Sequence, residues 1–136
     1  METSTTRFLA DRLDSDFIER RRLGGGNDRG DVGGVRTVAG ARLVVEVKDH
    51  GGSVQVKPWL DEAAVEAGND DAVAGVVVFK RARVGYGSPA EHGVLMTLET
   101  LCILLEGGVS HGPVVIPDSH TIMVDEIRDD EEWSKQ

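Results

Sequence analysis

The 136-residue sequence predicts an α/β domain in which helices flank a mixed β-sheet. Two runs of strand length and rich in β-branched residues, 42–48 and 74–79, supply the first observation. An amphipathic helical pattern between them supplies the second, because a strand–helix–strand crossing builds an α/β layer. The third is the order of all the expected elements, which is helix, strand, strand, helix, strand, strand and helix.

The first half of the chain contains a helix and a hairpin. Apolar residues at helical spacing predict a short helix over residues 4–13, and the glycines of Gly24–Gly26 predict a flexible turn. A strand is expected over 31–38, followed by a turn at Ala39-Gly40. The strand over 42–48 that comes next has the clearest strand pattern in the protein.

The second half continues with a helix that Pro58 can start and that runs to about Ala67. The continuous apolar run 74–79 is typical of a strand that is buried on both faces. A loop over 81–92, a strand over 94–98 and a helix over 99–105 complete this part.

The chain divides into a domain over residues 1–108 and a C-terminal extension over 109–136. Within the extension, 114–116 and 121–124 have the composition of short strands. The run of acids from Asp125 onward predicts a solvated acidic tail.

The net charge of −9 argues against a nucleic-acid enzyme, because phosphate binding normally needs a positive surface. The charge is unevenly distributed, however. Residues 1–48 carry nine Arg or Lys against eight Asp or Glu, residues 49–124 carry four against ten, and residues 125–136 carry two against six. The arginines therefore gather in the first third of the chain, and this weakens the objection.

The single cysteine, Cys102, lies inside an apolar run and is expected to be a buried small hydrophobe. One thiol cannot form an internal disulfide, so the cytoplasm is the expected location. The sequence contains no apolar run of membrane-spanning length, and its start has no signal-peptide core.

Asp31, Glu46 and Lys48 form the group of residues that points to chemistry. Alternation along a strand puts Glu46 and Lys48 on the same face, about 7 Å apart at their Cα atoms. A hairpin that turns at Ala39-Gly40 can bring Asp31 beside Glu46. Two carboxylates and an ammonium suit phosphodiester hydrolysis, because Mg²⁺ prefers oxygen ligands and activates water, and an ammonium can orient that water or stabilise the transition state.

The stretches 27–35 (NDRGDVGGV) and 43–48 (LVVEVK) resemble the motif pair of PD-(D/E)xK nucleases. More narrowly, they resemble the Holliday-junction resolvases of archaea and of actinobacterial phages, over about residues 1–106. The resemblance implies a restriction-endonuclease-like fold and a homodimeric, Mg²⁺-dependent endonuclease (with Mn²⁺ as a substitute) that cuts four-way DNA junctions, in the host cytoplasm if a phage encodes it. It also implies that Asp31, Glu46 and the Val47 carbonyl hold the metal and that Lys48 acts on the water.

The sequence departs from the family pattern at Gly30, where the family has proline, and from Gly108 onward the pattern has no counterpart. The family often completes its site with a glutamate from the first helix, and Glu2 is the candidate here. Two further candidates, Gln55 and Lys57, precede the second helix. Four arginines are candidates for binding phosphates, or else form a solvated face: Arg20, Arg21, Arg22 and Arg29.

Three other interpretations stay open. Glu-x-Lys is frequent in exposed strands, where opposite charges pair, so the tripeptide alone favours a structural role. The same fold also serves nicking, repair and restriction-type nucleases. Lastly, the net charge is compatible with a non-catalytic acidic binding module on this fold.

Overall fold

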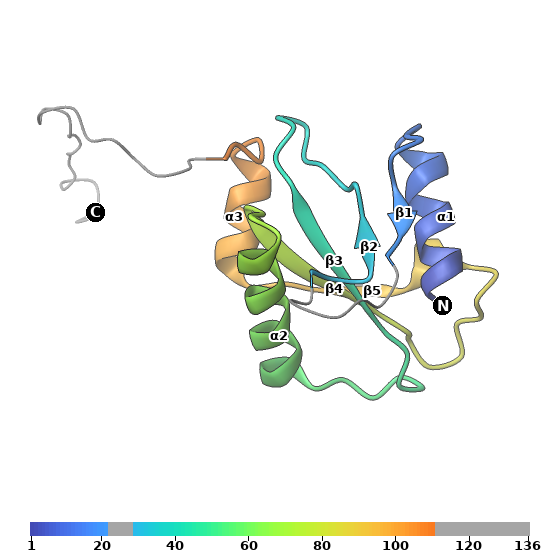
Figure 1. Ribbon diagram of the computed structural model, residues 1–136. Helices are drawn as coiled ribbons and strands as arrows, with labels where there is room; N and C mark the ends of the chain where they lie inside the picture. Colours follow the sequence, from blue (N-terminus) through green and yellow to red (C-terminus); the bar gives the residue numbers. More distant parts are fainter. Residues whose placement is uncertain (22–28, 111–136) are drawn as a thin grey trace, which may run out of the picture.

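The computed structural model describes residues 1–21 and 29–110 and shows a five-stranded mixed sheet with three α-helices (Figure 1). This confirms the α/β fold class with helices flanking a mixed sheet. Within the described residues, no helix is long and apolar enough to cross a membrane.

The sheet has the strand order β1-β2-β3-β4-β5. Its central pair, β3 and β4, is parallel, and every other neighbouring pair is antiparallel. The strands are β1 (Glu19–Arg20), β2 (Val32–Gly33), β3 (Leu43–Lys48), β4 (Ala74–Phe79) and β5 (Gly93–Leu95).

The parallel pair is joined by α2 (Val56–Asn69), as the strand–helix–strand pattern predicts. Trp59 and Ala63 on α2 are buried against Val77 of β4, so Trp59 belongs to the core. Gly75 permits this close approach, because a Cβ at that position would lie 2.5 Å from the carbonyl oxygen of Ala63.

The two faces of the sheet carry different parts of the core. Val45 and Val47 of β3 face α1 (Glu2–Arg12) and pack with Val32 and Leu9. The alternate residues of β3 face α2, and Figure 1 shows α1 and α2 at opposite ends of the view with the sheet between them. Because side chains alternate along β3, Glu46 and Lys48 share the face that α2 covers.

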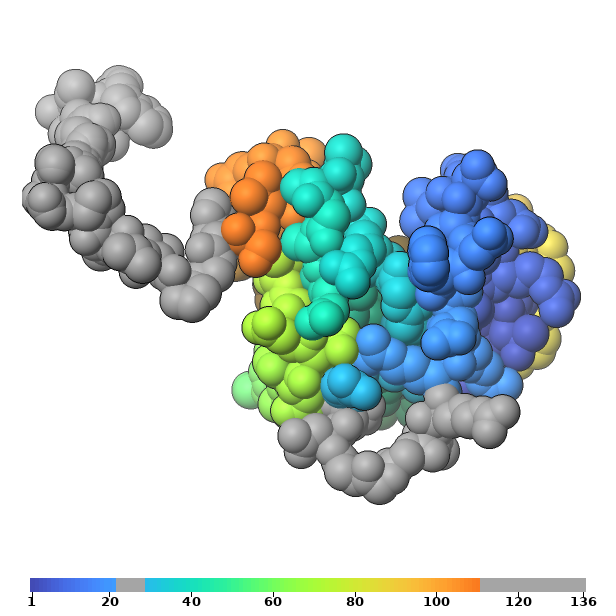
Figure 2. Space-filling view, turned by 45° about the horizontal axis from the view of Figure 1, so that its top comes forward, coloured from blue at the N-terminus to red at the C-terminus, as the bar shows by residue number. Residues whose placement is uncertain are grey.

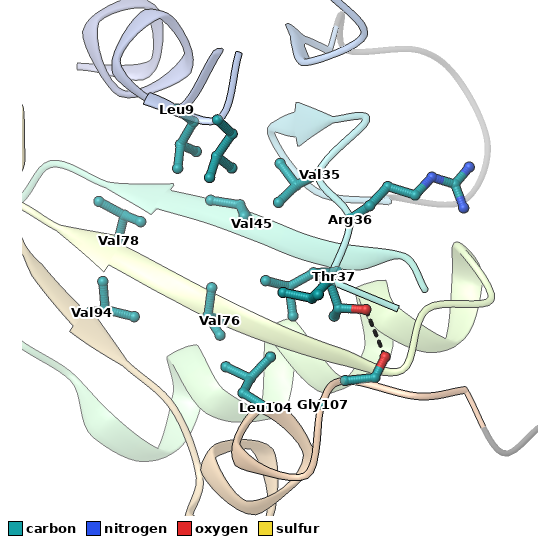
Figure 3. A pocket seen from close by; sticks show the side chains of 14 residues that line it. Leu9, Val35, Arg36, Thr37, Val45, Val76, Val78, Val94, Leu104 and Gly107 are labelled. Atoms are coloured by element: carbon teal, nitrogen blue, oxygen red, sulfur yellow. Dashed lines mark hydrogen bonds between the residues drawn. The ribbon is translucent and has the colours of Figure 1, made fainter. Parts of the chain in front are cut away.

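The face that α1 covers is not covered completely. An apolar trough of about 360 Å³ runs between α1 and α3 (Leu98–Leu105), over Val45, Val76 and Val78 (Figure 3). Leu104 and Val94 form its far wall. The chain after α3 is fixed at the rim, where the Thr37 hydroxyl donates to the Gly108 carbonyl at 2.6 Å.

The third helix is more exposed than its composition predicts. Leu98 and Leu105 are 75 % and 76 % exposed, and Cys102 is exposed as well. The prediction that Cys102 is buried is therefore wrong. The apolar side chains of residues 101–105 point to all sides of α3, but the sheet covers only one of these sides, so the others stay exposed.

The strand predicted over 31–38 is wrong beyond its first residues, because β2 ends at Gly33. Gly34 adopts a φ of +82°, and a Cβ there would lie 2.0 Å from the Phe17 carbonyl oxygen, so the chain bends at this point. Pairing resumes as an isolated bridge between Arg36 and Arg42. The edge strand β1 was not expected, since two charged residues give no apolar alternation.

The strand predicted over 74–79 is confirmed with the same bounds, and the other elements differ from the predictions by at most three residues at either end. The predicted loop 81–92 contains one 3₁₀ turn, η1 (Pro89–Glu91). Several predictions lie outside the described residues: the turn at Gly24–Gly26, Arg22, the strands at 114–116 and 121–124, and the acidic tail.

Candidate active site

Asp31 is placed by the β2–β3 hairpin. Its N–H donates to the Val45 carbonyl at 3.1 Å, and its carboxylate Oδ2 accepts from the Val47 N–H at 2.8 Å. The C=O of a strand residue points to the same neighbour as its N–H, so the Val47 carbonyl also faces the Asp31 side of β3. The predicted hairpin therefore brings Asp31 beside the Glu46–Lys48 segment.

Glu46 and Lys48 share one face of β3, as alternation predicts, and this face lies under α2. Glu46 is 6 % exposed, and its Oε2 lies 3.4 Å from the Lys48 Nζ. The Lys48 Nζ also contacts Glu62 Oε1 at 2.7 Å. Lys48 therefore bridges a strand carboxylate and a helix carboxylate.

Two carboxylates of the site come from α2 and were missed at the sequence level. Glu62 and Glu66 are four residues apart, so they share a face of the helix. Glu46, Glu62 and Glu66 each have one carboxylate oxygen within 4.8 Å of the other two. In residues 1–21 and 29–110, these are the acids that converge in this way. A signal was present, because Glu66 falls on the apolar stripe of α2 that contains Trp59 and Ala63.

Burial changes the proton affinity of Glu46. Burial is the largest cause that raises the pKa of this carboxyl from 4.5 to about 7. The neighbouring Glu66 carboxyl lowers the pKa, the charges of Asp31 and Glu62 raise it, and Lys48 lowers it again. With a pKa of about 7, Glu46 is partly protonated near neutral pH.

Lys48 stays charged in this surrounding. Burial lowers its pKa, but the hydrogen bond to Glu62 and the charges of Glu62 and Glu46 outweigh burial and raise the pKa above its ordinary value of 10.5. The ammonium is therefore protonated across the range in which Glu46 titrates.

The donor set fits a hard divalent cation. Four acids, which we call the carboxylate group, offer only carboxylate oxygens: Asp31, Glu46, Glu62 and Glu66. Such oxygens are the ligands that Mg²⁺ and Mn²⁺ prefer. Ionised together they repel one another, and Lys48 balances only one of their charges. A cation held by Glu46 and its neighbours would replace the proton that the site otherwise needs.

Glu2 lies elsewhere. Its Oε1 accepts from Arg20 Nε at 2.9 Å, and both residues line a hollow with Val47 and Asp49. Val47 faces α1, whereas Glu46 and Lys48 face α2, so the structure does not bring Glu2 into the carboxylate group.

The remaining predicted residues fall into two groups. Gln55 is the exposed residue that precedes α2, and Lys57 is exposed and pairs with Asp61 at 2.6 Å. Neither has a contact with the carboxylate group among the described residues. Arg21 and Arg29 instead meet Asp70, at 3.1 Å and 3.9 Å.

Comparison of the chain with protein-family models, with curated proteins and with solved structures gave no match.

Proposed function

We propose that this protein is a metal-dependent DNA endonuclease that hydrolyses phosphodiester bonds. The observation that carries the proposal is the meeting of Asp31, Glu46 and Lys48 at one hairpin, where Glu62 and Glu66 add two carboxylates. Phosphodiester hydrolysis needs a cation held by oxygen ligands and a positive group beside the water, and this site offers both kinds of group.

The residues have two roles: some would bind the metal ion, and Lys48 would act on the water that the ion binds. Glu46, with Asp31, the Val47 carbonyl and the α2 carboxylates, would hold Mg²⁺ or Mn²⁺. A bound ion of this kind supplies a water of lowered pKa and offsets charge on the phosphate oxygens. Lys48, held by Glu46 and Glu62, keeps its proton, and its ammonium would orient this water or stabilise the charged transition state.

The substrate that we propose is branched DNA, cut by a homodimer in the cytoplasm. Two symmetric cuts in a four-way junction need two sites related by a two-fold axis. The apolar trough supports a second copy as its occupant, because exposed apolar side chains border it on the hairpin tip, on β5 and on α3, at Val38, Val94 and Leu105. Exposed apolar patches of this kind mark association surfaces.

The test is cleavage of a labelled four-way junction and of a duplex of matching sequence, each with and without Mg²⁺. Junction cleavage that requires Mg²⁺ supports the proposal. Cleavage of duplex and junction at equal rates would favour a nicking, repair or restriction-type nuclease of the same fold. No cleavage of either substrate with Mg²⁺ or Mn²⁺ would contradict it.

A second candidate is a non-catalytic acidic binding module on the same fold. It is favoured by the net charge of −9 and by the burial of Glu66, which is 1 % exposed. On this alternative the carboxylates and Lys48 form a structural ion-pair network beneath α2. The protein would then bind a basic partner protein and leave DNA intact.

A further inference from the structure

Four arginine side chains converge on a polar hollow at the C-terminal end of α2. Arg21, Arg29, Arg36 and Arg42 line it, together with the carboxylate of Asp70, around a volume of about 220 Å³. They come from the segment after β1, from the segment before β2 and from the two sides of the hairpin. Figure 2 shows the N-terminal segment, the hairpin and the end of α2 (blue, cyan and yellow-green) meeting on one face.

The charge of this arginine pocket is opposite to that of the molecule. Among the described residues that line the pocket, four carry a guanidinium and one carries a carboxylate, in a chain of net charge −9. Like charges around a concave surface repel one another, and an anion with several acceptor oxygens relieves this repulsion. Guanidinium groups present forked donors that match the oxygens of a phosphate.

Asp70 holds the pocket in shape. This residue is 7 % exposed, its carboxylate meets Arg21 at 3.1 Å and Arg29 at 3.9 Å, and its carbonyl accepts from Arg42 Nη1 at 3.1 Å. Each guanidinium has five N–H groups. Bonds within the described chain take a minority of these groups in Arg21, Arg36 and Arg42, so donors are left for a ligand.

The pocket lies next to the carboxylate group. Glu62, Glu66 and Asp70, the C-cap residue of α2, follow one another at four-residue intervals, and the rise from Glu66 to Asp70 is about 6 Å. Arg42 comes directly before β3, about 13 Å along the strand direction from Glu46. Phosphates of one strand recur at about 3.4 Å along a duplex axis, so this separation equals roughly two to four nucleotides.

We propose that the arginine pocket binds a phosphate of the DNA backbone two to four nucleotides from the phosphodiester that is cut. This inference rests on the proposed function. It replaces Arg20, whose guanidinium is paired with Glu2, by Arg36 and Arg42 as phosphate contacts. The pocket sets where along a strand the carboxylates act, because it fixes the register of the backbone.

The first test measures binding of a fluorescein-labelled four-way junction by anisotropy, without divalent metal. Arg42→Gln and, separately, Arg36→Gln should each weaken binding about tenfold and lower the slope of log K against log[NaCl] by about 1. Arg7→Gln, an equal charge change at an exposed position of α1, is the control and should leave both quantities unchanged. Unchanged binding in both pocket variants, or an equal loss in the control, would overturn the proposal.

The second test locates the contact. A neutral methylphosphonate placed two to four nucleotides from the cut should weaken binding by the wild type and have no further effect on Arg42→Gln. Inorganic phosphate should compete with the junction only at far higher concentration, and competition at equal concentration would make the pocket a site for free phosphate instead. If these binding results hold but the junction is not cleaved, the nuclease proposal alone is contradicted. If the junction is cleaved but the pocket variants bind it as the wild type does, the pocket proposal alone is contradicted.

Discussion

At the scale of single residues, Glu46 sets the charge of the site before any cation binds. Burial and the charges of two neighbouring carboxylates raise the pKa of Glu46 to about 7, so this carboxyl is partly protonated near neutral pH. Protons and divalent cations compete for the same oxygens, because each neutralises the same repulsion. Metal binding should therefore release a proton and strengthen as the pH rises through 7.

The raised pKa also makes stability depend on pH. Between pH 4.5 and about 7 the folded protein keeps a proton on Glu46 that the unfolded chain has lost, so stability falls as the pH rises through this window. The pKa difference of about 2.5 between the two states corresponds to a loss on the order of 3 kcal/mol. Urea unfolding of the metal-free protein at pH 5 and pH 8 measures it. Glu46→Gln should flatten the dependence, and an unchanged pH profile in this variant would assign the effect to another group.

Lys48 is a second residue whose role can be separated from binding. Lys48→Met should lower turnover on a junction by about 100-fold or more, because the lost donor acts in the transition state. Junction affinity should change little, since one ammonium adds little among many cationic contacts. Single-turnover rates and anisotropy measure the two quantities. A large loss of affinity at unchanged turnover would make Lys48 a phosphate anchor.

The residues of the site were only partly predictable from sequence. Asp31, Glu46 and Lys48 could be placed together because strand alternation and a hairpin turn are local rules. Glu62 and Glu66 could not be placed, because the contact between α2 and β3 depends on how the crossover helix packs. The pairing of Arg20 with Glu2 likewise depends on where α1 meets the sheet edge.

At the scale of elements, the crossover helix α2 joins the fold to the site. One face carries Trp59 and Ala63 into the core, and the same face presents Glu62 and Glu66 to β3. The strands β3 and β4 were predictable from their composition. The bend after β2 was not, because it follows from the approach of Gly34 to the Phe17 backbone.

Gly75 tests how closely α2 must approach the sheet. Gly75→Ala should destabilise the protein by about 1–3 kcal/mol, because the new Cβ would lie 2.5 Å from the Ala63 carbonyl oxygen and push the helix outward. Gly68→Ala in α2 is the matched control, since its Cβ meets nothing within 4 Å and should stabilise the helix slightly. Chemical denaturation compares the two. Equal stability of the Gly75 variant and the wild type would show that α2 has room to shift.

At the scale of the whole molecule, the open apolar trough and the exposed side of α3 favour a dimer. Leu105→Glu should shift the protein to a monomer in light scattering and lower junction cleavage, because a charge would enter the interface. Val56→Glu, an equal change at an exposed position in the first turn of α2, should leave the dimer intact. A wild type that is monomeric at all concentrations would contradict the dimer.

Junction cleavage in three matched variants decides whether the hairpin that carries Asp31, Glu46 and Lys48 is an active site. With Mg²⁺, the wild type and Glu2→Gln should cut a labelled four-way junction, because Glu2 lies outside the carboxylate group. Asp31→Asn and Glu46→Gln should lose cleavage while they keep their fold and junction affinity. Cleavage by Asp31→Asn and Glu46→Gln at the wild-type rate, or its absence in the wild type, would contradict the assignment of this hairpin as an active site.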